Sequence, residues 1–357
     1  MKTGYIEGYY GKELSFKERE GLMHSLADLK MTHYFYCPKE DPYHRMQWKE
    51  DYDQDFLAHF SALNKAAISN NIEVIFGLSP GNDFDFERDY EILLKKYRKF
   101  ADLGINSFCL LFDDLFGINT GSSHRKILNQ LANDLGKFNL YTVPQIYCDQ
   151  LSPEKNILLD TYLSDFLEGL NPTVGIFLTG PRVVSKDYPL EYYNQLKQYL
   201  GQRELIIWDN YYANDYCAPK IHLSEFCDLD SGLQDCLDGI MINASGSLRI
   251  DQIYLQLFAS KVHQKHTKEE ILSKTNLPQA FYNIQHLFDF EIVTFDPESD
   301  LEHLEVLLWR WNDPLKIEMY TYLHQLRQLL QKITQDNAGD DILLKRFNFK
   351  RGDNNER

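Results

Sequence analysis

Short apolar runs alternate with longer amphipathic stretches along most of the chain. Eight runs of five to seven residues are rich in β-branched and aromatic side chains, which is typical of buried strands. They lie at residues 4–10, 33–37, 73–78, 107–112, 140–146, 174–179, 204–208 and 239–243. Apolar side chains recur at helical spacing between these runs, for example in residues 16–29, 56–68, 90–103 and 127–135. The pattern therefore predicts an alternation of strand and helix.

Eight strand–helix units in about 260 residues favour a barrel, because a (β/α)8 barrel usually takes about 250 residues. The alternative is an open, doubly wound sheet, which commonly carries a glycine-rich phosphate-binding loop after an early strand. Neither GxGxxG nor GxxxxGK[ST] occurs in the sequence. We therefore expect the α/β class, with a (β/α)8 TIM-type barrel over residues 1–264.

The pattern changes from about residue 265, where three segments have helical period and no strand lies between them. This predicts a small C-terminal helical domain over residues 265–347, followed by a polar tail, residues 348–357, that we expect to be disordered. The apolar stripes of the helical domain include Trp309 and Trp311. Such stripes either cover the barrel or form a partner surface, so a homodimer is one expectation.

Composition narrows the partners and the compartment. The chain of 357 residues is 43% hydrophobic, which is enough for a large core. Its 37 Lys and Arg against 53 Asp and Glu give a net charge of −16, so nucleic acids and anionic membranes are unfavourable partners. The six cysteines show no CxxC spacing, which favours reduced thiols and argues against a zinc site. Without a recognisable signal peptide or membrane span, we expect a cytoplasmic protein.

Polar residues follow every predicted strand, at the end of a barrel where active sites lie. Asp113 and Asp114 come directly after the run "SFCLLF", and buried charge is costly unless it is paired or used. Successive strand side chains point to opposite faces, so the two aspartates can serve one site only where the strand gives way to its loop. Because neighbouring carboxylates repel, we expect one to be ionised and the other protonated near neutral pH.

These motifs resemble glycoside hydrolase family 84, which includes protein O-GlcNAcases and bacterial β-N-acetylglucosaminidases. The resemblance runs in the family's order from residue 4 to about residue 245. It rests on "EGYYG" (7–11), "YCPKEDPYHR" (36–45), "LSPGND" (78–83), "LLFDD" (110–114), "TGPRVVS" (179–185), "WDNYYANDY" (208–216) and "GIMIN" (239–243). It implies a retaining exo-β-N-acetylglucosaminidase in which the substrate's own 2-acetamido oxygen attacks the anomeric carbon and forms an oxazoline. Neither a cofactor nor a metal is implied.

The resemblance also implies roles for individual residues. Asp113 would orient and polarise the acetamido N–H, and Asp114 would act as general acid and base. The substrate-binding residues would be Gly8, Lys39, Tyr147, Trp208, Asn210, Asp215 and Asn243.

These substrate-binding residues divide by the part of the sugar they would meet. Tyr147 would bond the acetamido oxygen, and Asn210 would hold the acetamido group or the aspartate pair. Trp208 would line a pocket for the methyl group, and Gly8 would offer a backbone carbonyl where a side chain would block the sugar. Lys39, Asp215 and Asn243 would bond sugar hydroxyls. Taken without the resemblance, a surface lysine and two capping residues are the simpler interpretations of these three.

Other functions remain open at this stage. The substrate is either O-GlcNAc on Ser or Thr of proteins or, as in hyaluronidase-like enzymes, a glycan oligosaccharide. A non-catalytic GlcNAc-binding protein would keep the same pocket. A metal-dependent barrel enzyme would use the two aspartates as ligands, with Asp83, Asp85 and His44 as the conceivable additional ones.

Overall fold

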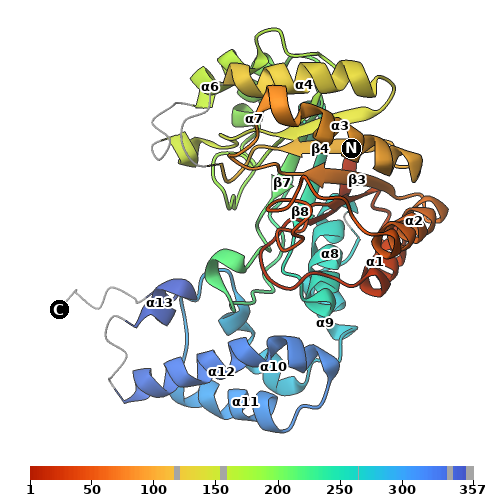
Figure 1. The fold of residues 1–357 in the computed structure, drawn as a ribbon. Helices are drawn as coiled ribbons and strands as arrows, with labels where there is room; N and C mark the ends of the chain where they lie inside the picture. Colours follow the sequence, from red (N-terminus) through yellow and green to blue (C-terminus); the bar gives the residue numbers. More distant parts are fainter. Residues whose placement is uncertain (116–120, 153–158, 264, 336–340, 351–357) are drawn as a thin grey trace. The chain divides into compact units, whose positions relative to one another are not determined.

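Eight parallel strands close into a barrel in chain order (Figure 1). The computed structural model describes residues 1–115, 121–152, 159–263, 265–335 and 341–350. The strands are β1 (Lys2–Glu7), β2 (His33–Tyr36), β3 (Glu73–Leu78), β4 (Ser107–Leu111), β5 (Asn139–Val143), β6 (Gly175–Leu178), β7 (Leu205–Asp209) and β8 (Gly239–Asn243). All eight predicted strands are confirmed, and β1 pairs with β8 to close the barrel, Ile6 lying opposite Asn243.

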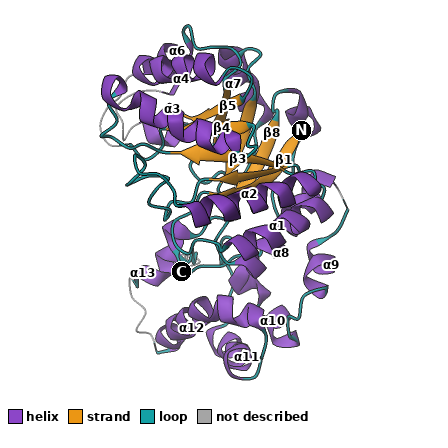
Figure 2. Ribbon diagram, turned by 45° about the vertical axis from the view of Figure 1, so that its right-hand side comes forward, coloured by secondary structure: helices purple, strands orange, loops and turns teal. Residues whose placement is uncertain are grey.

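Helices follow the strands and lie outside them, as Figure 2 shows for α1 to α4 around the orange strands. The helices before β7 are α1 (Phe16–Asp28), α2 (Gln54–Ser69), α3 (Phe86–Asp102), α4 (Gly121–Leu135), α6 (Leu159–Leu167) and α7 (Leu190–Leu200). Two 3₁₀ turns also belong here: η1 (Asp149–Leu151) follows β5, and η3 (Ser231–Asp235) follows β7. The α1 start illustrates how the sequence sets these boundaries. Ser15 accepts from the backbone N–H of Glu18, and the Glu18 side chain accepts from Ser15 in return. The predicted (β/α)8 class is confirmed.

The two faces of β4 show which side chains point into the barrel. Cys109 and Leu111 belong to the apolar cluster that fills the interior, together with residues of the other strands. Phe108 lies on the opposite face, and its ring centroid is 5.1 Å from that of Tyr97 on α3. A side chain two positions beyond Leu111 therefore continues the inward-facing series.

The chain divides into two compact units. The first contains residues 1–211 and 227–246, and the second contains residues 212–226 and 247–357. The second unit holds α8 (Leu248–His263), α9 (Lys268–Ser273), α10 (Gln279–Asn283), α11 (Pro297–Trp309), α12 (Pro314–Thr334) and α13 (Ile342–Arg346), with 3₁₀ turns η2 (Asp215–Cys217) and η4 (Gln285–Phe288). Helices α11 and α12 pack side by side. Helix α8, which lies within the predicted bounds of the barrel domain, groups with the C-terminal helices.

The second unit also holds the first residues of the predicted tail. The backbone N–H of Ile292 donates to Asn348 at 3.0 Å, and the N–H of Lys350 donates to Ile292 at 2.8 Å. Residues 348–350 are therefore ordered by pairing, whereas 351–357 lie outside the described residues. The six cysteines are free thiols, as predicted. Within the described ranges, no helix is long and apolar enough to cross a bilayer.

Candidate active site

Asp113 and Asp114 lie where β4 gives way to its loop. The strand ends at Leu111, and the buried Asp113 side chain follows on the inward-facing side. Asp114 has a left-handed backbone, with φ of 57°, a conformation that Asp tolerates better than most residues. The chain turns there, so both carboxylates meet the same ammonium group: Lys39 Nζ bonds Asp113 Oδ2 and lies 3.3 Å from Asp114 Oδ2. The predicted convergence of the pair at the barrel rim is confirmed.

Lys39 reaches this position from the loop after β2. Its side chain is only 4% exposed, so the surface-lysine interpretation is wrong. Burial lowers the pKa of Lys39, but the charges of Asp113 and Asp114 more than offset this and raise it above its usual range. Lys39 is therefore the counterion of the aspartate pair as well as a predicted ligand of the sugar.

Asp113 has an oxygen without a hydrogen-bond partner among the described residues. Its Oδ2 atom bonds Lys39, whereas Oδ1 is buried and accepts no hydrogen bond. A buried, unsatisfied acceptor costs about 1–3 kcal/mol, more if it is charged. Such an oxygen is suited to an N–H donor that arrives with a ligand.

Asp114 is bound from a different side. Its Oδ2 atom accepts a hydrogen bond of 2.8 Å from the Tyr10 hydroxyl, and Arg45 Nη1 donates to that hydroxyl at 2.8 Å. Tyr10 follows β1, and Arg45 lies in the β2–α2 loop. Both residues belong to the motifs "EGYYG" and "YCPKEDPYHR", but no role was predicted for either. In the sequence, only their position after the ends of two predicted strands indicated that they could belong to the site.

The two carboxyl groups are pushed apart in pKa, in the order opposite to the one their predicted roles suggest. Burial and the charge of Asp114 raise the pKa of Asp113 more than Lys39 lowers it. Burial also raises the pKa of Asp114, but Lys39 and the Tyr10 hydrogen bond outweigh it, so that pKa is lowered. The two pKa values are therefore displaced in opposite directions, and without a ligand Asp114 is the more acidic of the two. The order depends on Tyr10 and Lys39, neither of which was predicted to be a partner of the pair.

Four predicted residues form one hydrogen-bonded chain across the rim of β1, β7 and β8. The Gly8 N–H donates to Asn243 Oδ1 at 3.2 Å, and Asn243 Nδ2 donates to Asn210 Oδ1 at 3.0 Å. Trp208 Nε1 donates to the same Asn210 oxygen at 2.9 Å. Asn210 Nδ2 bonds the carbonyl of Val183, so the partners of Asn210 are neighbours on the rim and not the aspartates. The structure therefore brings these four residues together.

Gly8 and Trp208 are matched in shape. A Cβ atom at Gly8 would lie 2.4 Å from Trp208 Cζ2, closer than real contacts allow. Trp208 is buried in the interior cluster, with its ring centroid 5.6 Å from that of Phe35. The need for glycine at position 8 thus follows from the tryptophan already present, in addition to the predicted approach of a sugar.

Tyr147 follows β5 and is half-buried against the interior cluster. Burial, Asp113 and Asp114 all raise the pKa of Tyr147, in that order of importance. The phenol is therefore neutral at physiological pH and can donate. The structure places it within electrostatic reach of the aspartate pair, as its predicted role requires.

The remaining candidates have other surroundings. Asp215 belongs to η2 in the second unit, and its predicted contact with the sugar stays a prediction. Asp85 caps α3 by accepting from the Arg88 N–H, and His44 Nδ1 bonds the Gly77 carbonyl. Burial lowers the pKa of His44 to about 3, so it is neutral. Helix capping and loop anchoring thus account for these two conceivable metal ligands.

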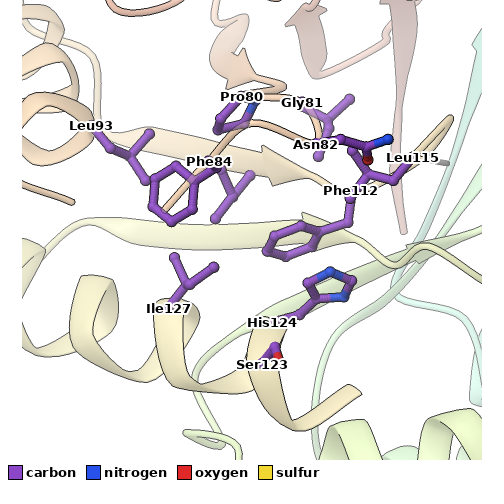
Figure 3. Close-up of a pocket in the computed structure, with 12 residues that line it drawn as sticks. Pro80, Gly81, Asn82, Phe84, Leu93, Phe112, Leu115, Ser123, His124 and Ile127 are labelled. Atoms are coloured by element: carbon purple, nitrogen blue, oxygen red, sulfur yellow. The ribbon is translucent and has the colours of Figure 1, made fainter. Parts of the chain in front are cut away.

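A small cavity of about 110 Å³ lies on the helix side of β4 (Figure 3). Phe112 and Leu115, which flank the aspartate pair, line it, and the Phe112 ring stacks on His124 of α4 with centroids 4.0 Å apart. Because the aspartates face Lys39 and the barrel interior, this cavity is separate from the site.

A closed parallel barrel with a carboxylate pair at its rim, held by a buried lysine, is an architecture of barrel enzymes. The model of the family described as NAGidase, beta-N-acetylglucosaminidase, matches residues 3–289. The chain therefore belongs to this family of glycoside hydrolases, glycoside hydrolase family 84, as the motifs predict.

Known proteins agree with this assignment. The protein O-GlcNAcases of Mus musculus and Rattus norvegicus are each 27% identical over 328 residues, which cover 86% of this chain and 36% of their own length. A mutant of the Thermobaculum terrenum O-GlcNAc hydrolase has a TM-score of 0.78 at 22% identity and covers 97% of this chain and 87% of its own. The structure of CpGH84B has a TM-score of 0.72 at 23% identity and covers 98% of this chain and 65% of its own. At these identities the two structures establish the fold.

Proposed function

We propose that this chain is a retaining exo-β-N-acetylglucosaminidase that uses the substrate's 2-acetamido group as the nucleophile. The observation that carries the proposal is the buried Asp113 Oδ1 atom, which accepts no hydrogen bond from the described residues. The acetamido N–H would satisfy it, and its negative charge would make the acetamido oxygen a better nucleophile. Tyr147, a neutral phenol beside the pair, would donate to that oxygen.

Asp114 is the proposed general acid and base. When the acetamido oxygen bonds to the anomeric carbon, the bond to the leaving oxygen breaks and Asp114 gives that oxygen its proton. The Asp114 carboxylate then takes a proton from water, whose oxygen opens the oxazoline and restores the original anomeric configuration. The Asp114 side chain is 35% exposed against 9% for Asp113, which suits the member that must face a leaving group on its way to solvent.

The low pKa of Asp114 is compatible with an acid role if the sugar itself changes it. A sugar bound against Asp114 would cover its exposed oxygen atoms, and burial raises the pKa of a carboxyl group. The same sugar would supply Lys39 with hydroxyl partners and weaken its hold on Asp114. Binding would thereby shift the proton toward Asp114.

The substrate class we propose is O-GlcNAc on Ser or Thr of proteins, processed in the cytoplasm, by a glycosidase that needs no cofactor. Its support is the similarity to two protein O-GlcNAcases, of which this chain spans 36%. The loops around Asp114 set which leaving group fits. A glycopeptide and a matched chito-oligosaccharide, compared by kcat/KM, would decide between protein and glycan substrates.

Substrate assistance is tested with two aryl glycosides. We expect the β-N-acetylglucosaminide to be hydrolysed and the matching β-glucoside to be nearly inert, because only the first carries the nucleophile. A thiazoline mimic of the oxazoline should inhibit strongly, since it resembles the transition state. Equal turnover of both glycosides would contradict the mechanism, and binding without turnover would favour a GlcNAc-binding protein. Loss of activity with a chelator would favour the metal-dependent alternative.

A further inference from the structure

The hydroxyl of Tyr10 links the aspartate pair to the β2–α2 loop. It donates to Asp114 Oδ2 at 2.8 Å and accepts from Arg45 Nη1 at 2.8 Å. Two cations also lie near the Tyr10 ring, Lys39 Nζ at 5.9 Å and the Arg45 guanidinium at 5.5 Å from its centroid. The two cations and the carboxylate therefore fix the ring and its hydroxyl in one orientation.

Asp114 is held by contacts of its side chain. It lies beyond the end of β4 and has a left-handed φ of 57°. Its side chain is 35% exposed, so surrounding atoms do not pack it tightly. It accepts a hydrogen bond from Tyr10, and Lys39 contributes a longer contact of 3.3 Å.

We propose that Tyr10, oriented by Arg45, is a positioning residue for the general acid and base Asp114. The inference rests on the proposed function, because it matters only if Asp114 transfers a proton. The hydrogen bond aims one carboxyl oxygen away from the leaving group and leaves the other, Oδ1, to carry the proton that is transferred. Misplacement by about 1 Å costs up to about 100-fold in rate, so a fixed carboxyl orientation has a direct kinetic value.

The same hydrogen bond acts on the proton affinity of Asp114. A donor to the ionised carboxylate favours that form, and the Tyr10 bond is among the causes that lower the pKa of Asp114. Among the described residues, the other charged or titratable groups that act on this position are Lys39, Arg45, Asp113 and Tyr147. Since Tyr10→Phe removes the hydroxyl and keeps the ring, it isolates the hydrogen bond from these charges.

Tyr10→Phe should therefore move the pH profile in a defined direction. Hydrolysis through a protonated Asp114 is lost as pH rises through the pKa of Asp114. Because the variant raises that pKa, the alkaline limb of kcat, which reports the enzyme–substrate complex, should move to higher pH, by roughly half to one pH unit. At the optimum, kcat/KM should fall about tenfold for a poor leaving group and less for an activated aryl leaving group.

Arg45→Gln provides an independent second variant. It removes the donor to Tyr10, so it should shift the alkaline limb in the same direction. The Arg45 charge also acts directly on Asp114, and this direct effect is the same whether position 10 is Tyr or Phe. A double-mutant cycle with Tyr10→Phe should therefore show coupling, because the two residues share one hydrogen-bonded chain. If Tyr10→Phe does not fold, an alkaline limb that stays in place in Arg45→Gln would still overturn the inference.

Tyr199→Phe is the matched control. Tyr199 lies on α7 and is 45% exposed, as Tyr10 is, and its substitution should leave the profile unchanged. An alkaline limb that stays in place, or moves to lower pH, in folded Tyr10→Phe or Arg45→Gln would overturn the inference. Asp114→Asn, measured in parallel, separates failure of this inference from failure of the proposed function. If Asp114→Asn retains full activity toward poor leaving groups, Asp114 is not the general acid and the proposed function is wrong.

Discussion

At the scale of single residues, the site depends on how a strand ends. The inward-facing series of β4 continues through Asp113, whereas Asp114 would face outward if the strand went on. The left-handed backbone of Asp114 turns its side chain to the same side, where Lys39 meets both carboxylates. Asn tolerates this conformation as Asp does, so Asp114→Asn tests chemistry with less backbone strain than Asp114→Ala would introduce.

Lys39 controls the ionisation of Asp113, and this gives a prediction about pH. Lys39 lowers the pKa of Asp113 against the larger effect of burial, so Lys39→Met should raise it further, by roughly 1–3 pH units. The proposed role needs ionised Asp113, which is lost as pH falls. The acid limb of kcat/KM should therefore move to higher pH, with part of the activity regained in alkaline buffer. An acid limb that does not move would show that Lys39 acts on the sugar alone.

At the scale of elements, the β2–α2 loop carries much of the site and is tied down from α3. Lys96 is buried, and its ammonium donates to three backbone carbonyls of this loop, those of Tyr43, Trp48 and Glu50, each at 2.7 Å. The loop also contains Lys39 and Arg45. A helix residue remote in sequence thus fixes the two cations that meet the aspartate pair.

Lys96→Met should weaken both folding and catalysis. It leaves three carbonyls without their donor, and we expect the free energy of unfolding to fall by about 2–4 kcal/mol. Loop displacement should also lower kcat/KM at temperatures where the variant is folded. Thermal unfolding and kinetics measure the two effects. The control is Lys95→Met, whose neighbouring side chain is 75% exposed; equal behaviour of the two variants would contradict the anchoring role.

At the scale of the whole molecule, the barrel was predictable because each strand is a distinct apolar run and each strand end is polar. The candidate site could be located for the same reason, since parallel strands bring their carboxyl ends together. The hydrogen bonds between residues of the site could not be predicted. Tyr10, Lys39 and Asp114 come from three loops, and no spacing along the chain reveals that they bond one another. The pKa order of the aspartates depends on those bonds, so the sequence predicts that the two pKa values differ but not which of them is lower.

Exposed apolar side chains on the helices of the second unit allow a test of whether the protein forms a dimer. Trp311 is buried and donates to the Asn276 carbonyl, whereas Trp309 is 58% and Ile317 77% exposed. If these exposed side chains form a partner surface, sedimentation at micromolar concentration should show a dimer that Ile317→Glu disrupts. Tyr199→Glu, at an exposed site on α7, is the control. A strictly monomeric profile would remove the partner-surface interpretation.

The central claim is the division of labour between the two aspartates, and a series of aryl N-acetylglucosaminides with graded leaving-group pKa tests it most directly. Asp114→Asn should lose most activity toward poor leaving groups and little toward activated ones, giving a steep dependence on leaving-group pKa. Asp113→Asn should slow cyclisation for every substrate, by about 2–4 kcal/mol, without steepening the slope. Asp83→Asn, at an exposed rim aspartate, should match the unmodified protein. A steep slope in Asp113→Asn would reverse the roles, and full activity in both variants would contradict the account.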